Sequence, residues 1–173
     1  MYDWRRYQAM AWTTVKYPEA GRDLLYPCMG LVVEVCSELL PKLTAYRGDG
    51  NTVESIYITL GDVLWYVSAI AQMDYIDLSL IMLSVNTPSV APSPQRAGYS
   101  DVLQLVGWVG TLVDRVARKS NNRIVPDDFI KVLTAIVQGL TNIAASLGVS
   151  ISDVADMNIE KIRRIPNGKE NAE

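Results

Sequence analysis

Histidine is absent from the sequence, and cysteine is rare. Without histidine, a Ser-His or Cys-His nucleophile is excluded, and a general base has to be a carboxylate, a lysine, a tyrosine or a metal-bound water. The two cysteines, Cys28 and Cys36, lie in one apolar run, and by themselves they make neither a zinc site nor a disulfide framework. We therefore predict that both are small buried side chains in a protein of the reducing cytoplasm.

An excess of basic residues is also missing. The chain has 16 lysines and arginines against 19 aspartates and glutamates, which gives a formal net charge of -3. Because nucleic-acid binding through phosphates needs a basic face, this balance argues against a nucleic-acid partner. The N-terminal segment lacks the basic-then-apolar order of a signal peptide, and no apolar run reaches the roughly 20 residues of a membrane span without a polar interruption. The expectation is a soluble protein with no membrane partner.

Every long segment of the 173-residue chain has the periodicity of a helix, so the predicted fold class is all-α, a helical bundle. Asp3 is a predicted N-cap, as is Ser150 or Ser152, and Gly148 is placed to end a helix. A helix that starts at residue 27 is expected to end or kink near Pro41, because proline lacks a backbone donor and clashes one turn back. The expected helices cover residues 4–15, 27–40, 52–73, 78–85, 101–119, 126–147 and 153–165.

Two helical blocks are predicted, residues 1–85 and residues 100–173, joined by a proline-rich linker over residues 86–99. The blocks resemble each other, because "GLVVEVCSELLPK" from Gly30 aligns with "GWVGTLVDRVARK" from Gly107 so that glycine, valine and lysine coincide. A duplicated helical hairpin with a pseudo-two-fold axis would explain the similarity. The alternative is that amphipathic helices of similar composition align to this extent by chance.

Three acidic residues stand out by their positions. Glu34 and Glu38 are four residues apart and share one helix face, where they form either an ordinary solvated surface or a site for a divalent cation such as Mg²⁺. Asp62 lies in "YITLGDVLWYV", an apolar and aromatic stretch in which an unpaired carboxylate is costly. Its partner is predicted to be a metal ion shared with Glu34, a basic side chain such as Lys42 or Arg47, or a capping backbone amide.

Four segments, taken in order, resemble the signature segments of the MazG-like all-α nucleoside triphosphate pyrophosphohydrolases. They are "YQAMAWTTVKYPEAGRDLLYPCMGL", "EVCSE", "LGDVLWYVSAIA" and "ISDVADMNIEKIRR", and they span most of the chain outside residues 74–147. The resemblance implies a MazG-like helical bundle in which two antiparallel helices supply a Glu-x-x-Glu pair and a Glu-x-x-Asp pair that bind Mg²⁺. It also implies that water attacks the α-phosphorus of a nucleotide to release pyrophosphate and the monophosphate, while an Asn-x-x-Lys pair helps to hold the phosphates.

Carried over to this sequence, the resemblance assigns four residues of the family's site. Glu34 and Asp62 fall on the first and last carboxylates, which implies that they are catalytic and bind the metal ion. Asn158 and Lys161 fall on the Asn-x-x-Lys pair, which implies that they bind the substrate. Trp65 is a further substrate-binding candidate, because an indole can stack on a nucleobase; the alternative is that this aromatic side chain packs in the helical core.

Two positions depart from the family's pattern. Its remaining glutamates fall on Ser37 and Thr59, whose neutral hydroxyls are weak substitutes for carboxylates as Mg²⁺ ligands. We expect Glu38 to serve as the third metal ligand after a small rotation of its helix, and Asp114, which takes the place of Ser37 in the second block, to be available as a fourth. The second block is otherwise poor in acids at these positions and is predicted to be a scaffold half.

The sequence therefore predicts a Mg²⁺-dependent hydrolase that converts a nucleoside triphosphate to the monophosphate and pyrophosphate, weakened by its two hydroxyl positions. The alternative is a catalytically inactive member of the same fold that binds a nucleotide or acts as a scaffold. The family resemblance also implies a homo-oligomer, either a dimer or a tetramer.

Overall fold

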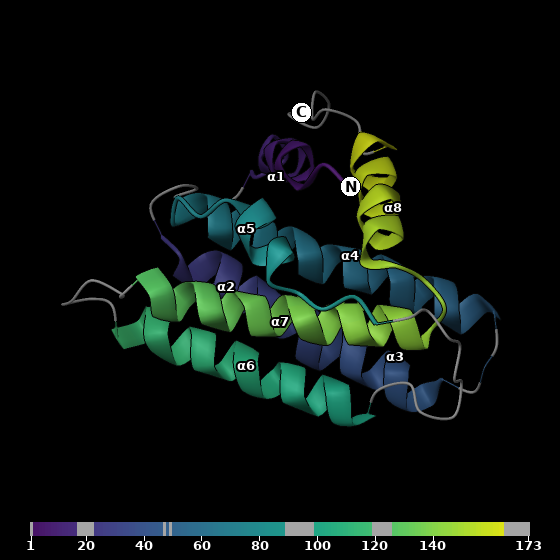
Figure 1. The fold of residues 1–173 in the computed structure, drawn as a ribbon. Coiled ribbons are helices and arrows are strands. Elements are labelled where there is room, and N and C mark those ends of the chain that lie inside the picture. The colour runs from purple at the N-terminus through teal and green to yellow at the C-terminus, as the bar shows by residue number, and fades with distance from the viewer. Residues whose placement is uncertain are drawn as a thin grey trace, which may run out of the picture.

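All regular structure in the described part of the chain is helical (Figure 1). This computed structural model describes residues 2–16, 23–46, 48, 50–88, 99–118 and 126–164, so most of the predicted linker and the chain after residue 164 lie outside the described residues. The prediction of an all-α fold is confirmed. The helices are α1 (Trp4–Trp12), α2 (Leu25–Val33), η1 (Glu34–Leu39), α3 (Leu40–Ala45), α4 (Gly50–Met73), α5 (Leu78–Leu83), α6 (Tyr99–Arg118), α7 (Pro126–Ser146) and α8 (Ile151–Arg164).

Local sequence signals set several of these helix ends. The carboxylate of Asp3 accepts a hydrogen bond from a backbone N–H of the first turn of α1, as predicted. At α8 the Ser150 hydroxyl accepts from the Asp153 N–H at 3.1 Å, and the Asp153 carboxylate accepts from the Ser150 N–H at 3.0 Å. This reciprocal pair is a capping box. Gly148, with φ +86°, follows α7 and supplies the left-handed conformation at its end.

Of the two outcomes predicted for the second helix near Pro41, an end or a kink, the end is wrong, and the irregularity found there is a π-helical turn. One continuous helix runs from α2 through η1 and α3 to Ala45, and η1 is a π-helical turn in which the Leu40 N–H reaches back five residues to the Val35 carbonyl. Proline lacks a donor and crowds the preceding turn, and the wider turn just before Pro41 relieves that crowding. Single π turns occur often at functional sites, and this one begins at Glu34.

Residue contacts show that α2, η1 and α3 run antiparallel to α4. In α2, Gly30 lies against the ring of Tyr66, so close that a Cβ at residue 30 would clash with the ring. Further along, Lys42 of α3 bonds to Thr59 of α4. Residue numbers therefore increase along one helix as they decrease along the other, which is the antiparallel arrangement. The η1 turn, which begins at Glu34, lies between these two contacts.

The helices α6 and α7 form a second antiparallel pair, which packs on the first. Arg115 near the end of α6 pairs with Asp128 near the start of α7 at 3.0 Å, while Leu105 lies beside Gly139. The helix α6 packs against α2, and α7 packs against α4. The short helices exchange partners between the pairs, because α5, which follows α4, packs on α7, whereas α8, which follows α7, packs on α4.

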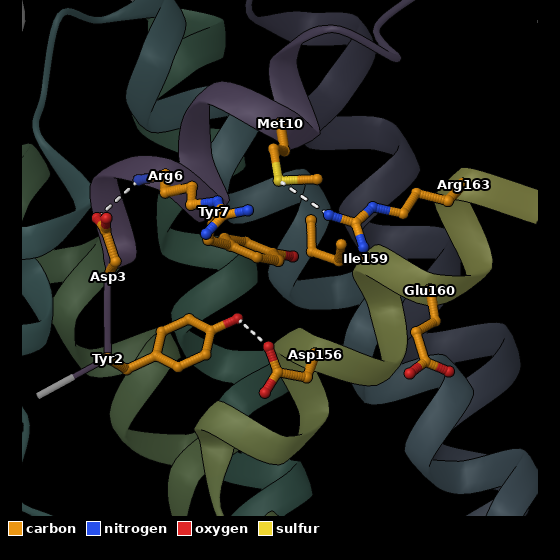
Figure 2. Close-up of a pocket in the computed structure, with 9 residues that line it drawn as sticks. All are labelled: Tyr2, Asp3, Arg6, Tyr7, Met10, Asp156, Ile159, Glu160 and Arg163. Carbon is orange, nitrogen blue, oxygen red and sulfur yellow. Dashed lines mark hydrogen bonds between the residues drawn. The ribbon is translucent and has the colours of Figure 1, made fainter.

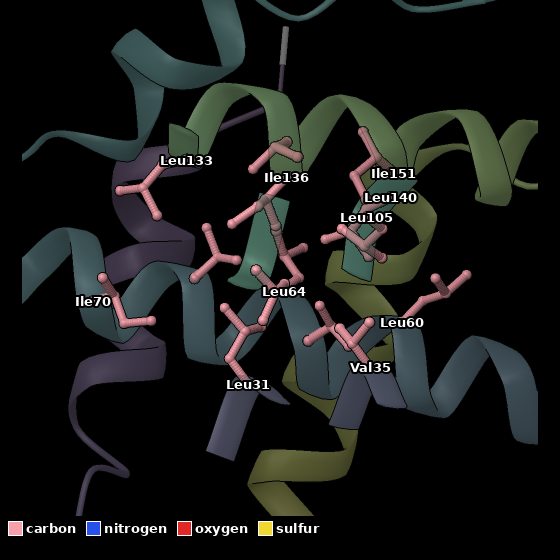
Figure 3. Close-up of a cluster of buried hydrophobic side chains, with 14 of the residues drawn as sticks. Leu31, Val35, Leu60, Leu64, Ile70, Leu105, Leu133, Ile136, Leu140 and Ile151 are labelled. Atoms are coloured by element: carbon pink, nitrogen blue, oxygen red, sulfur yellow. The ribbon is translucent and has the colours of Figure 1, made fainter. Parts of the chain in front are cut away.

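The four long helices and α8 enclose one apolar core, to which residues on both sides of the predicted linker contribute (Figure 3). The helix α4 lies at its centre, where Leu60 and Leu64 are completely buried among the side chains of α2, α7 and α8. Burial of each such side chain contributes about 1.5–3 kcal/mol relative to exposure. Other members drawn in the figure are Leu31, Val35, Ile70, Leu105, Leu133, Ile136, Leu140 and Ile151.

The helices α1 and α8 lie on one side of the bundle, and α8 crosses the long helices instead of following them (Figure 1). The side chain of Gln8, buried in α1, donates to the Ile76 carbonyl at 2.8 Å and accepts from the Leu78 N–H at 2.9 Å. These bonds fix α1 against the turn before α5. The helix α1 thereby covers α4 next to α8, at the place where the predicted site residues meet.

Two stretches, Thr52–Met73 and Asp128–Ser146, are long and apolar enough to cross a membrane by length and composition. They belong to α4 and α7, which pack against each other in the core. Because the core helix of a soluble protein meets the same criteria, the two stretches are weak evidence for membrane spans.

Candidate functional site

The carboxylate of Asp62 is held by a lysine from the end of the described chain. The Lys161 Nζ lies 2.7 Å from one carboxylate oxygen and 2.5 Å from the other. The Asp62 side chain is 24% exposed and that of Lys161 is 43% exposed, so the pair lies at the surface of the bundle and is only partly screened by water. A basic side chain was one of the predicted partners, and the one found is Lys161 of α8 instead of Lys42, while Arg47 lies outside the described residues.

Asn158 lies one helical turn before Lys161 and is almost fully buried. Its side-chain oxygen accepts a hydrogen bond from the Tyr7 hydroxyl at 3.0 Å, and its amide nitrogen lies 3.5 Å from the Asp62 carboxylate. Burial raises the pKa of Tyr7 well above its usual value, so this phenol stays protonated and remains a donor. Tyr7 thus fixes Asn158 from behind, and Asn158 faces Asp62.

Gly61 allows α8 to come this close to α4. A Cβ at residue 61 would fall 2.9 Å from the Cβ of Asn158 and 3.1 Å from its amide nitrogen. Any larger residue would push α8 outward, and with it the side chains that reach Asp62. The "LGD" of the sequence therefore combines a close helix approach at Gly61 with the carboxylate that follows it.

Glu34 of η1 is partly buried on the other side of Asp62. We call the line along which η1 and α8 meet α4 the polar seam. Burial raises the pKa of its carboxyl group, and the nearby carboxylates of Asp62 and Glu38 raise it further, while Lys161 and Lys42 act in the opposite direction. The surroundings as a whole favour the protonated form, chiefly because burial withdraws the carboxyl group from water. The structure therefore brings together all four residues carried over from the family resemblance, Glu34, Asp62, Asn158 and Lys161.

A second polar group lies next to this one along the seam. The Lys42 Nζ donates to the Thr59 hydroxyl at 2.7 Å and pairs with the Glu38 carboxylate at 2.9 Å. Thr59 is 2% exposed, and its hydroxyl donates in turn to the Ser55 carbonyl at 3.0 Å. Glu38, the expected third metal ligand, is thus engaged by an ammonium group, and its side chain is 48% exposed.

The acids do not gather into the three- or four-carboxylate site that the sequence suggested. Asp114 lies on the exposed side of α6, where it pairs with Arg118 at 2.8 Å, and Ser37 is exposed. Among the described residues, no group of three histidine, cysteine, aspartate or glutamate side chains is placed to hold a metal ion. What remains is the pair Glu34 and Asp62. Two carboxylates match the number that Mg²⁺ commonly takes from a protein, with water and substrate phosphates completing its shell, but both oxygens of Asp62 are bonded to Lys161 here.

Trp65 makes packing contacts, one of the two roles between which the sequence did not decide. Its indole N–H donates to the Ala11 carbonyl at 3.2 Å and to the Thr14 hydroxyl at 3.0 Å, and its ring meets Tyr66 edge to face. These bonds join α4 to the end of α1. The packing role is therefore found in the structure, and contact with a nucleobase stays a prediction.

Sequence reasoning missed the roles of Tyr7 and Lys42 in the site. Tyr7 was given no role, although the hydroxyl of a buried tyrosine requires a partner. Lys42 was considered as a partner for Asp62, and it lies instead beside Thr59. The sequence did contain a signal for Lys42. It follows Glu38 by four residues, a spacing that favours an ion pair on one helix face.

A cavity of about 520 Å³ lies between α1 and α8, next to this site (Figure 2). Tyr7 forms part of its wall, but Glu34, Asp62, Asn158 and Lys161 do not line it. Both signs of charge meet there, so charge alone does not favour an anionic ligand. The lining residues are Tyr2, Asp3, Arg6, Tyr7, Met10, Asp156, Ile159, Glu160 and Arg163.

Comparison of the chain with models of protein families, with curated proteins and with solved structures finds no match. The fold and the site by themselves define the class: an all-helical bundle with a polar seam of carboxylates and lysines at the meeting point of α2, η1, α4 and α8.

Proposed function

We propose that this chain is a Mg²⁺-dependent nucleoside triphosphate pyrophosphohydrolase of the MazG-like type. The observation that carries the proposal is the meeting of Glu34, Asp62 and Lys161, with Asn158 beside them, in one seam of the fold. Asp62 and Lys161 are 99 residues apart in the sequence. Residues so far apart in the sequence are not brought together by local structure. A site that binds phosphates and a metal ion requires an ammonium group and a carboxylate close together.

The reaction in this proposal breaks the bond between the α-phosphorus and the oxygen that bridges to the β-phosphorus. Water adds to the α-phosphorus and gives up a proton, and pyrophosphate leaves. The proton passes to water or to a carboxylate of the site, because the chain has no histidine to accept it. Lys161 and the amide nitrogen of Asn158 are donors suited to phosphate oxygens, and Tyr7 keeps Asn158 in position.

Glu34 and Asp62 are the residues that would hold Mg²⁺ in this site. When bound, the ion would neutralise charge on the phosphoryl oxygens. Support comes from the repulsion that the Asp62 and Glu38 carboxylates exert on Glu34, which a cation would relieve. Lys161 is half exposed, so its ammonium group can exchange the Asp62 carboxylate for a phosphate without leaving a buried charge unpaired.

The helix packing supports the finer description of the fold, a MazG-like bundle made of two duplicated hairpins. The pair α2 and α4 lies on the pair α6 and α7, and each short helix that follows a pair packs on a helix of the other pair. A pseudo-two-fold axis would relate such contacts to one another. In this proposal the block of α6 and α7 is the scaffold half, because its Asp114 lies at the surface away from the seam.

A second candidate function is supported by the group around Lys42. At Thr59 the family pattern has an acid, and here a hydroxyl holds an ammonium group instead. A chain that has exchanged metal ligands in this way would bind a nucleotide without hydrolysing it at an appreciable rate. This candidate is a catalytically inactive nucleotide-binding protein of the same fold.

The proposal includes a homo-oligomer. Leu25, Met29 and Val33 follow one another at intervals of four residues on α2 and are 44%, 48% and 51% exposed. Residues so spaced form one apolar stripe along a helix. The stripe is a suitable surface for a second copy of the chain.

Pyrophosphate release tests the proposed function. We would incubate the protein with each common ribo- and deoxyribonucleoside triphosphate, with Mg²⁺ or with EDTA, and compare Asp62→Asn with Asp114→Asn as the matched control. The pyrophosphohydrolase proposal predicts Mg²⁺-dependent release that Asp62→Asn abolishes and Asp114→Asn preserves. Nucleotide binding without release would support the second candidate. Release that persists in Asp62→Asn would contradict the assignment of the site.

A further inference from the structure

Among the described residues of the seam, Lys42 is a cation that the proposed function does not use. Its Nζ is held from one side by the Thr59 hydroxyl and from the other by the Glu38 carboxylate. An ammonium group has three N–H donors, and these two contacts leave one free to reach a ligand. The two partners differ in mobility, because Thr59 is buried and bonded to the backbone of its own helix, whereas Glu38 is half exposed.

The position of Lys42 relative to the rest of the site follows from α4. Thr59 and Asp62 are three residues apart on this helix, so the two side chains leave the same face about 4.5 Å apart along its axis. Lys42 bonds to the first and Lys161 to the second. The side chains of α4 that hold the two ammonium groups are therefore about one helical turn apart, and both ammonium groups act on the carboxylate of Glu34.

Such a pair of cations matches a chain of linked phosphates, which carries its negative charges at a similar spacing. An arriving phosphate can replace Glu38 at Lys42, because the glutamate side chain swings into water without being left buried and unpaired. Thr59 keeps the ammonium group in place during this exchange. An ammonium group held there also repels a divalent cation, so it excludes a second metal ion from this end of the seam.

We propose that Lys42, positioned by Thr59, is a phosphate-binding residue that supplies the positive charge of a second metal ion, so that the chain uses a single Mg²⁺. This inference rests on the proposed function for the identity of the ligand, a nucleoside triphosphate. The placement of the ammonium group rests only on the contacts of Lys42, Thr59 and Glu38.

Binding to a non-hydrolysable triphosphate analogue, in the presence of Mg²⁺, gives the first test. Lys42→Met keeps most of the side chain and removes its charge, and Lys131→Met, at an exposed position on α7, is the matched control. Loss of a charged hydrogen bond predicts a dissociation constant raised roughly tenfold or more for the analogue and for inorganic pyrophosphate. The nucleoside monophosphate, which has no further phosphates to reach Lys42, should bind as in the wild type. Unchanged analogue and pyrophosphate affinity in a folded Lys42→Met protein would overturn the proposal.

Counting bound Mn²⁺ by electron paramagnetic resonance gives a second test that needs no catalytic activity and no nucleotide. The double variant Lys42→Met with Thr59→Glu replaces the ammonium group and its hydroxyl partner by a carboxylate beside Glu38. We expect this variant to bind one more Mn²⁺ per chain than the wild type, and Thr59→Glu alone to gain none, because Lys42 then pairs with the new acid. No gain in a correctly folded double variant would contradict the replacement of a metal ion by Lys42.

The two tests separate failure of this inference from failure of the proposed function. If the wild type binds no nucleotide, the proposed function is wrong, and a gain of Mn²⁺ in the double variant then supports only the exclusion of a metal ion by Lys42. If the wild type binds the analogue through Glu34 but Lys42→Met does not weaken that binding, the proposed function stands and the inference about Lys42 fails.

Discussion

Replacing Gly61 by alanine tests the close packing of α8 on α4, on which the geometry of the site depends. The added Cβ would lie 2.9 Å from the Cβ of Asn158, closer than van der Waals contact allows. The atom that it meets is near the backbone of α8, so it cannot move aside by rotation of a flexible side chain. The helix α8 itself has to shift, and Asn158 and Lys161 shift with it.

Two opposing contributions set the expected change in the free energy of unfolding of Gly61→Ala. Alanine inside a helix is more favourable than glycine by about 1 kcal/mol, whereas forcing an extra carbon atom into a packed interface costs about 1–3 kcal/mol. Gly107→Ala on α6 is the matched control, because nothing lies within 4 Å of the new Cβ and only the first contribution applies. The control should therefore be stabilised by about 1 kcal/mol, and Gly61→Ala should be less stable than the control by about 1–3 kcal/mol.

Thermal and urea unfolding of the two variants measure this difference. For a chain of this size, each kcal/mol corresponds to about 2–4 °C in Tm, so the variants should differ by at least about 2 °C. Gly61→Ala should also weaken binding of a nucleotide analogue, and Gly107→Ala should not. If Gly61→Ala raised the stability as much as Gly107→Ala, the close contact between α4 and α8 would be wrong, and with it the position of Asn158.

Three further predictions concern the charge, the packing and the assembly of the protein. The pKa of Glu34 is raised in the folded state, so its ionised carboxylate lowers the free energy of unfolding above the folded pKa and has no such effect below the unfolded pKa. In urea unfolding at pH 7 with EDTA present, Glu34→Gln should therefore be more stable than the wild type. Equal stability at pH 7 would contradict this. Trp65→Phe removes the bonds to Ala11 and Thr14 and should lose at least about 1 kcal/mol in urea unfolding, whereas an unchanged midpoint would show that these bonds do not stabilise α1. Met29→Glu places a charge in the exposed apolar stripe of α2 and should reduce the molar mass measured by light scattering to that of a monomer, while an unchanged oligomer would exclude this stripe as the interface.

The helices were predictable because their signals are local. The apolar spacing of α4 and α7, the Asp3 cap and the Gly148 stop each depend on a few neighbouring residues. The π turn at Glu34 was not predictable in the same way, because one extra residue in a turn hardly changes the apolar pattern of a long helix. Pro41 marked an irregularity in the right region, but the helix absorbed it and continued.

The members of the site were easier to find than the bonds between them. Asp62 was recognisable because a carboxylate is costly in an apolar helix, yet its partner Lys161 lies 99 residues further along the chain. Only the packing of α8 on α4, made possible by Gly61, brings the two together. The choice of Lys42 between Asp62 and Thr59 likewise depends on the register of two helices, which neither helix specifies alone.

The central claim is that Glu34 and Asp62 together bind the metal ion that accompanies a nucleotide. Isothermal titration of a non-hydrolysable triphosphate analogue into the wild type and Glu34→Gln, with and without Mg²⁺, tests it most directly, and Glu54→Gln at an exposed position on α4 is the control. The account predicts Mg²⁺-dependent binding in the wild type and in Glu54→Gln, and its loss in Glu34→Gln. Binding of equal strength in Glu34→Gln, or binding in the wild type that does not depend on Mg²⁺, would contradict the account.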